Sequence, residues 1–465
     1  MIKYLQFGLG FGCLSLSGTT IYNWGGLPPI AIAVAVGVIL PLCVAAVAFG
    51  SAIAKNQTFG RVFLLCIFGA ALGTFAGEYY LNEKFTVQET ENKLSRTKIK
   101  KNIQKEINAL VREGITAYPI VVPATWLPNL TKTNSADRPR ELLPLSALSN
   151  VRTITCDEGG GLVHYDSDEF GFRNPRGIWR QQPIQIALVG DSYLHGACVH
   201  SPHLIADVIR AQFPATLNFG MGGNGPLLEL ATVREFGTVT RPQHVVWLFT
   251  IENDFFELTK ENKILGLNAY FDHGYSQNLM SRQEEVDSIV KQRIQPVSAK
   301  KISTTKRIAG RQKIETSKES TDIGRSKASF VWRCFLTLCR VRTTTGVIFS
   351  KPKRNYDLFR AVLKSAQESI TTWGGRLWFV YVPSSSELMG LSRFDLTSEL
   401  IRKELFKSVR SLGISVIDGL DILEEKSNGR SLHYYWSSHF NPLGQRLLGE
   451  GIVEALVAGN GKKAK

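Results

Sequence analysis

Residues 184–196 read IQIALVGDSYLHG, a short apolar run that is followed at once by a polar turn. A run that is apolar at nearly every position is typical of a parallel strand buried on both faces. A polar residue just beyond the carboxyl end of such a strand stands where open α/β sheets bind their ligands. Ser192 is therefore a candidate reactive residue, with a helix cap as the alternative role for Asp191 and Ser192.

Similar runs recur along the chain and alternate with amphipathic stretches, which predicts strands alternating with helices. The further predicted strands are ATLNFG (215–220), HVVWLFTI (244–251), RLWFVYVP (376–383) and ISVIDG (414–419). The predicted helices between them include 203–213, 226–236, 354–372 and 396–412. This order predicts an α/β fold, a three-layer sandwich with a mostly parallel sheet.

Three further polar motifs follow these runs in a fixed order. They are NFGMGG at 218–223, IEND at 251–254 and SHFNPLG at 438–444. With the Gly-Asp-Ser turn, this series resembles the SGNH (GDSL-like) hydrolase superfamily, over roughly residues 184–455. Each motif is weak by itself, but four in the right order at strand ends are jointly specific.

The resemblance implies a role for each motif. Ser192 would be the nucleophile and His439 its general base, because a serine hydroxyl attacks poorly until a base accepts its proton. The oxyanion hole would comprise the backbone amides of Ser192 and Gly223 and the side-chain amide of Asn253. Each such donor contributes roughly 3–4 kcal/mol to transition-state stabilisation. The alternative roles are a flexible turn for Gly223 and a helix cap for Asn253.

The chain departs from the superfamily pattern beside the predicted base. Members usually carry an Asp three residues before the His, and Trp436 stands at that position. We expect His439 to be oriented by a backbone carbonyl, by Ser437 or by an acid from elsewhere in the chain. Asp191 and Asp254 are expected to support the turns around the site.

The segment CDEGGGLVHYDSDEFGFRNP (156–175) precedes the predicted nucleophile strand. Its second half is similar to a stretch found in some bacterial envelope-associated SGNH proteins. That similarity suggests a wall of the active site, with Arg173 facing the substrate, and a β-hairpin on the sheet edge is the alternative. Among the soluble cysteines the first pairing expected is Cys156–Cys198, with unpaired thiols as the alternative. We expect no metal and no cofactor, because neither Cys nor His shows metal-ligand spacing.

The first eighty residues are strongly apolar and predict a membrane anchor. Residues 28–54 and 61–81 are long enough to cross a bilayer, and residues 4–20 are marginal. Lys55 and Arg61 lie in the loop between the two strong spans, which predicts a cytoplasmic loop and an extracytoplasmic soluble domain. Basic residues just after the second span favour the opposite orientation.

The predicted organisation is an anchor at 1–83, a stalk and connector at 84–150 and a catalytic domain at 151–460. An insertion at 257–350 interrupts the last of these, and its basic segment 293–330 is expected to be disordered.

The net charge is +15 over 465 residues, but much of the excess lies in predicted linker segments. No nucleic-acid-binding motif accompanies it, so nucleic acid is not an expected partner. The sequence predicts a serine esterase or acyltransferase that acts on cell-envelope polysaccharide, with the bilayer and other envelope polysaccharide proteins as partners. The alternative is an SGNH-fold protein with little or no activity that binds or scaffolds glycan assembly.

Overall fold

The structure is a computed structural model that describes residues 98–127, 142–156, 158, 160–294, 354–388, 396–428, 434 and 439–461, with positions 76, 79 and 80. The chain divides into two compact units. Nearly all described residues belong to the unit formed by Arg96–Ile308, Arg354–Leu391 and Ile401–Lys465. The features that follow belong to this unit, apart from residues 396–400 and positions 76, 79 and 80.

Five parallel strands form the main sheet, and each lies within a predicted apolar run. In spatial order they are β5 (Thr216–Asn218), β4 (Ile186–Val189), β6 (His244–Thr250), β7 (Arg376–Val382) and β8 (Ser415–Asp418). The prediction of an α/β fold with a parallel sheet is confirmed. The strand that precedes Ser192 lies inside the sheet, between the strands that follow it in the chain.

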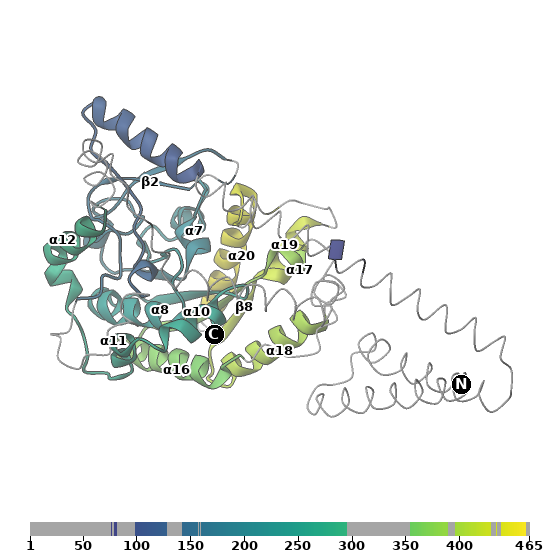
Figure 1. The fold of residues 1–465 in the computed structure, drawn as a ribbon. Coiled ribbons are helices and arrows are strands. Elements are labelled where there is room, and N and C mark those ends of the chain that lie inside the picture. The colour runs from purple at the N-terminus through teal and green to yellow at the C-terminus, as the bar shows by residue number, and fades with distance from the viewer. Residues whose placement is uncertain are drawn as a thin grey trace, which may run out of the picture. The chain divides into compact units, whose positions relative to one another are not determined.

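Side chains alternate along each strand between two apolar layers. In β4, Ile186 and Leu188 join one layer, whereas Ala187 and Val189 join the other. The first layer is covered by α7 (Ile205–Gln212), α19 (Gly419–Ser427) and α20 (Pro442–Gly461). The second is covered by α8 (Pro226–Thr232), α10 (Asp254–Glu261), α16 (Tyr356–Thr372) and α18 (Leu396–Arg410). Helices on both faces of the sheet (Figure 1) explain why the inner strands β4, β6 and β7 are buried and almost wholly apolar.

A separate three-stranded sheet is built from residues upstream of the nucleophile strand. It contains β1 (Ala117–Pro119), β2 (Arg152–Thr155) and β3 (Val163–Asp166), with β1 parallel and β3 antiparallel to β2. Residues 98–112 are helical, and Ile107 of this helix packs against Ala117 and Ile154. The β2–β3 hairpin was one of the two structures expected for residues 156–175, but it lies in its own sheet.

Residues 142–149 were expected to be an extended connector, yet they are buried in the main core. The Ser149 amide and hydroxyl donate to the Asp287 carboxylate at 3.0 and 2.6 Å. The amide of Leu143 donates to Gln277 Oε1 at 2.8 Å. These bonds to long-range partners fix a segment whose Pro, Leu and Ser composition favours no regular element.

The shorter elements complete the described part of the chain. They are η2 (Pro123–Thr125), η3 (Ile178–Arg180), α6 (Ser192–His195), the π-helical η4 (Val233–Gly237), α9 (Thr238–Thr240), α11 (Leu265–Asn268), η5 (Ala269–Phe271), η6 (Leu279–Arg282), α12 (Gln283–Ile294) and α17 (Ser385–Leu388).

Among the described residues, no helix combines the length and the apolar character needed to cross a bilayer. The predicted spans at 4–20, 28–54 and 61–81 lie outside these residues, apart from the helical positions 76, 79 and 80. The basic segment at 293–330 also lies outside them beyond Ile294.

Candidate active site

Three of the predicted motifs meet at the carboxyl edge of the main sheet. Ser192 follows β4, the turn at Gly222 and Gly223 follows β5, and Asn253 follows β6. The strand order places β4 between β5 and β6. The chain therefore crosses from β4 to one side of the sheet to form β5, and then crosses back past β4 to form β6 on the other side. Such a switch in direction opens a crevice at the strand ends, which is where doubly wound sheets bind their ligands.

Asp191 holds the nucleophile turn in place. Its carboxylate accepts the Tyr193 amide at 2.9 Å, and so caps the single helical turn that Ser192 begins. The same carboxylate accepts the Thr250 hydroxyl at 3.2 Å and Asn253 Nδ2 at 3.0 Å. Burial raises the pKa of Asp191, and these hydrogen bonds work in the other direction. Asp191 therefore ties the end of β4 to the end of β6, and it contacts the predicted oxyanion donor.

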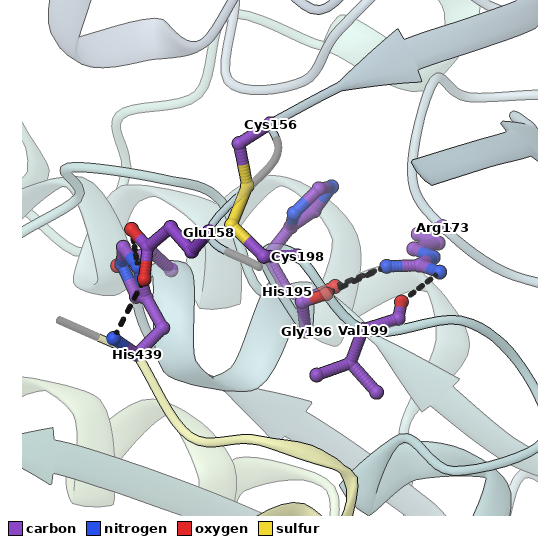
Figure 2. Close-up of a disulfide and its surroundings, with 9 residues drawn as sticks. Cys156, Glu158, Arg173, His195, Gly196, Cys198, Val199 and His439 are labelled. Atoms are coloured by element: carbon purple, nitrogen blue, oxygen red, sulfur yellow. Dashed lines mark hydrogen bonds and ion pairs between the residues drawn. A yellow bond between two sulfur atoms is a disulfide. The ribbon is translucent and has the colours of Figure 1, made fainter. Parts of the chain in front are cut away.

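His439 bridges the serine and a carboxylate. Its Nε2 lies 2.9 Å from Ser192 Oγ, and its Nδ1 lies 2.8 Å from Glu158 Oε1. The second carboxylate oxygen, Oε2, accepts the backbone amide of His439 at 3.1 Å. Because a carboxylate accepts, the proton of the neutral ring is held on Nδ1, and Nε2 is left free to accept from the serine. The three residues form a Ser-His-Glu chain, and Figure 2 shows the contact between His439 and Glu158.

Glu158 is the functional residue that the sequence interpretation did not identify, although an acid from elsewhere was one expectation. It lies two positions after Cys156, and Cys156 forms a disulfide with Cys198, their Cα atoms 5.2 Å apart. Cys198 lies six positions after Ser192, so the disulfide holds the Glu158 loop beside the nucleophile turn (Figure 2). The expected Cys156–Cys198 pairing is confirmed, and it was the available signal for Glu158.

The segment after His439 starts the last helix with favourable local chemistry. Asn441 Oδ1 accepts the Gly444 amide at 3.0 Å, and Pro442 is the first residue of α20. An Asn that caps and a Pro in the first turn are both favoured at a helix N-terminus. His439 is thus held between Glu158 and a fixed helix start.

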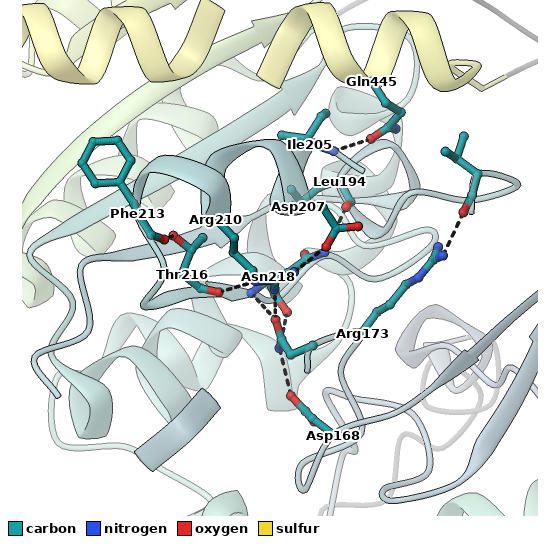
Figure 3. A network of polar contacts seen from close by, with 12 residues as sticks. Asp168, Arg173, Leu194, Ile205, Asp207, Arg210, Phe213, Thr216, Asn218 and Gln445 are labelled. Carbon is teal, nitrogen blue, oxygen red and sulfur yellow. Dashed lines mark hydrogen bonds and ion pairs between the residues drawn. The ribbon is translucent and has the colours of Figure 1, made fainter. Parts of the chain in front are cut away.

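Gln445 joins this helix to the nucleophile turn. Its Nε2 donates to the Tyr193 carbonyl at 2.7 Å, and its Oε1 accepts the Ile205 amide at 3.0 Å. The side chain is fully buried. One amide therefore connects α20 to α6 and to the start of α7, and Figure 3 shows the bond to Ile205.

Gly223 has φ of +75°, in the left-handed region that favours glycine. Its neighbour Gly222 lies against the nucleophile, since a Cβ at Gly222 would be 3.9 Å from Ser192 Cβ. The turn therefore lies beside Ser192, as the proposed oxyanion role of Gly223 requires.

Asn253 occupies the N-cap position of α10, but its side chain does not bond to that helix. One amide hydrogen is used on Asp191, and an amide nitrogen carries two. The next residue, Asp254, is buried and accepts the Thr250 amide at 2.7 Å through Oδ2. Burial and the nearby carboxylates raise the pKa of Asp254. Asp254 closes the strand-to-helix turn.

Arg173 does not line the site as expected. It is buried, and its guanidinium donates to the carbonyls of His195, Gly196 and Val199 at 3.3, 2.8 and 2.8 Å. It also lies over the ring of Tyr165, 4.9 Å from the centroid. Arg173 braces the segment between the nucleophile turn and the disulfide from behind (Figure 2).

A polar network lies next to this brace. The buried Asp168 carboxylate accepts the amide of Phe172 at 2.8 Å, Trp179 Nε1 at 2.8 Å and Asn174 Nδ2 at 2.9 Å. Asn174 Nδ2 donates to the Asn218 carbonyl at 3.0 Å as well, and Figure 3 shows Asp168 and Asn218 in this network. The Asp-Glu-Phe-Gly-Phe-Arg-Asn stretch therefore fixes the end of β5 and does not contact Ser192 through these side chains.

Two predicted positions cannot be placed, because Trp436 and Ser437 lie outside the described residues. Within the described part of the chain, one group of side chains has metal-ligand geometry, and it consists of Glu158, Cys198 and His439. The sulfur of Cys198 is bonded to Cys156, and the imidazole and carboxylate bond to each other. These three residues do not fit a metal centre.

No protein-family model matches the chain, and no curated protein matches its sequence. Solved structures do align with it. A lipolytic G-D-S-L protein from Veillonella parvula is 13% identical, with a TM-score of 0.30, 58% of this chain covered and 96% of that one. The lipase/acylhydrolase from Enterococcus faecalis is 15% identical, with a TM-score of 0.29 and coverages of 58% and 94%.

A two-domain esterase active on acetylated mannans is 10% identical, with a TM-score of 0.29 and coverages of 59% and 49%. The chain is similar to G-D-S-L lipolytic hydrolases. These are the proteins that the order of its motifs resembles.

The titration of His439 predicts the pH dependence of activity. Burial alone lowers its pKa, but the hydrogen bond and charge of Glu158, with the charges of Asp191 and Glu252, raise it above the usual value of 6.5. The imidazole accepts a proton only when neutral, so kcat/KM for an ester should fall as pH drops through this raised pKa. Glu158→Gln removes the charge and should move the midpoint to lower pH. A profile of p-nitrophenyl acetate hydrolysis from pH 5 to 8.5 measures both midpoints, and equal midpoints would contradict the assignment.

Loss of the disulfide should affect stability and turnover together. The double variant Cys156→Ser/Cys198→Ser opens a cross-link between residues 42 apart in sequence, which should cost about 2–4 kcal/mol of unfolding free energy. It also releases the Glu158 loop, so kcat should fall at least about 10-fold. Thermal melting and p-nitrophenyl acetate turnover measure these effects. A mild reductant should lower the kcat of the wild-type protein toward that of the double variant and leave the kcat of the variant unchanged. A double variant as active as wild type would show that Glu158 is held in place without the disulfide.

Proposed function

We propose that this protein is a serine hydrolase that cleaves or transfers ester-linked acyl groups through an acyl-Ser192 intermediate. The observation that carries the proposal is the hydrogen-bonded chain from Ser192 Oγ through His439 to Glu158. A nucleophile in contact with a base, and a base oriented by a third group, is the geometry that activates a serine.

The chemistry follows from this geometry. His439 Nε2 takes the Ser192 proton as Oγ attacks the carbonyl carbon of the ester, and a tetrahedral oxyanion forms. Glu158 stabilises the resulting imidazolium through Nδ1–H. The backbone amides of Ser192 and Gly223 and the second side-chain amide hydrogen of Asn253 would donate to the oxyanion. Collapse breaks the ester C–O bond, and His439 gives its proton to the departing alcohol.

The acyl-Ser192 is then released by the reverse sequence. His439, now neutral, takes a proton from water or from an acceptor hydroxyl, whose oxygen attacks the acyl carbon. Water gives hydrolysis and an alcohol gives acyl transfer. Both outcomes use the same three residues.

The alternative of an inactive scaffold was favoured by the absence of an Asp three residues before His439. Glu158 supplies a carboxylate to that ring, so the alternative loses its main support. A fluorophosphonate probe separates the two functions. We expect labelling of the wild-type protein and none of Ser192→Ala, whereas a folded wild-type protein that stays unlabelled would favour the scaffold.

We further propose an O-acylated cell-envelope polysaccharide as substrate, and a membrane-anchored, extracytoplasmic domain. The apolar sequence at 28–54 and 61–81 and the basic loop between these segments support the anchor and its orientation. The Cys156–Cys198 disulfide is consistent with an oxidising compartment. In a bacterial host, alkaline phosphatase fused to the C-terminus should be exported across the membrane and active. An inactive fusion would show that the domain faces the cytoplasm.

A further inference from the structure

The turn around η2 lies directly over the glycines beside the nucleophile. A carbon atom at the Cβ position of Gly222 would lie 3.5 Å from Val122 Cγ1 and 3.9 Å from Ser192 Cβ. Both distances are ordinary van der Waals contacts. Val122 Cγ1 and Ser192 Cβ are therefore so close together that at most one carbon atom fits between them. A Cβ on Gly223 would similarly meet the Ala124 Cβ at 3.1 Å.

Hydrogen bonds hold this turn in place. The Val122 carbonyl accepts both the amide and the hydroxyl of Thr125, at 3.0 and 2.7 Å. The Pro123 carbonyl accepts the Trp126 amide at 3.0 Å, and Pro123 is buried. Arg293 donates to the Thr125 carbonyl at 3.1 Å. A substrate group too long for the space beside Ser192 would have to displace the turn at residues 122–126, which these hydrogen bonds hold in place.

The small sheet explains why this turn and Glu158 reach the same site. β1 and β2 are parallel neighbours, so their carboxyl ends lie at one edge. β1 continues to Val122, and β2 continues to Cys156 and Glu158. The Ile120 amide donates to the Ile154 carbonyl at 3.1 Å, which extends the pairing beyond β1. One sheet edge thus carries the acid that orients His439 and the apolar wall above Ser192.

We infer that Val122 limits the acyl group of the substrate to the size of an acetyl group. The inference rests on the proposed esterase function and narrows it. In the acyl-Ser192 intermediate, the acetyl carbonyl carbon bonds to Ser192 Oγ, and its methyl group fits the one-carbon space below Val122. The apolar contact suits a methyl, and a butyryl chain would meet Val122. One methylene in an apolar pocket changes kcat/KM by roughly 10–200-fold.

The test compares p-nitrophenyl acetate with p-nitrophenyl butyrate for three proteins. Wild type should prefer acetate at least about 10-fold in kcat/KM. Val122→Ala removes the Cγ1 methyl and should raise the butyrate-to-acetate ratio at least about 10-fold. Val122→Ile adds one methyl and should reduce acetate turnover. Val151→Ala is the matched control, because Val151 is also half-buried but precedes the opposite end of β2, and it should leave the ratio unchanged.

The outcomes separate the inference from the function on which it rests. If acetate is hydrolysed and the fluorophosphonate probe labels Ser192, but Val122→Ala leaves the ratio at the wild-type value, only the inference is overturned. If 4-methylumbelliferyl and p-nitrophenyl acetates change their relative rates in Val122→Ala while the acyl preference does not, the space holds the alcohol, which also overturns it. If wild type neither hydrolyses acetate nor takes up the probe, the esterase function fails, and the inference fails with it. Thermal melts of both Val122 variants show whether the fold is intact.

Discussion

Ser192→Ala and His439→Ala should each reduce turnover of p-nitrophenyl acetate by on the order of 10⁴-fold or more, with the fold intact. Ser192 supplies the attacking oxygen, and His439 supplies the nitrogen 2.9 Å away that accepts its proton. Because the two act as one unit, the double variant should be no slower than either single variant. Initial rates measured with a fluorogenic or chromogenic acetate give the three values.

The controls are the exposed residues Ser281 and His203, whose replacement by Ala should leave the rate unchanged. Far-ultraviolet circular dichroism shows whether each variant is folded. A Ser192→Ala protein as active as wild type would contradict the esterase function itself, since no other group in the proposal forms the acyl intermediate.

Glu158→Ala should reduce kcat by about 10²–10⁴-fold, the range expected when the group that orients a catalytic His is lost. The variant loses the bond to Nδ1 and the bond to the His439 backbone amide, so both the tautomer and the position of the ring become less defined. KM should change little, because Glu158 contacts the base and no part of the proposed substrate. Glu158 is thus a positioning residue, and the split between kcat and KM is its signature.

Glu252 provides the matched control near the same ring. Its carboxylate accepts the Tyr193 hydroxyl at 3.3 Å and raises the pKa of His439 by its charge. Glu252→Ala should lower the midpoint of the pH profile slightly and leave kcat at its plateau close to wild type. A larger loss of kcat in Glu252→Ala than in Glu158→Ala would indicate that Glu252, and not Glu158, orients His439.

The parallel sheet was predictable because its inner strands are buried on both faces. Such strands read as continuous apolar runs, and all five appear in the sequence within two residues of their observed ends. The polar motifs at their carboxyl ends were predictable for the same reason, since parallel strands deliver these ends to one edge. That rule places Ser192, Gly223 and Asn253 at one edge, and the resemblance to the SGNH superfamily supplied their expected roles.

The rest of the site depends on long-range contacts that leave no local pattern. Glu158 reaches His439 across 281 residues, through a small sheet whose three-to-four-residue strands give little signal. Arg173 was expected beside the substrate because its stretch is similar to one found in some envelope-associated SGNH proteins. Its three carbonyl partners lie in the segment after the nucleophile, and no periodicity of residues 165–175 indicates that contact.

The Gln445 amide has a consequence for when the protein can first act. It couples the C-terminal helix to Tyr193 and Ile205, and His439 lies only a few residues before it. During synthesis, the serine and the carboxylate emerge well before the imidazole, because domains are made from the N-terminus onward. A nascent chain that ends before residue 439 holds an unactivated hydroxyl. We therefore expect the proposed hydrolase to become active only when α20 docks onto the core, after the chain has left the ribosome.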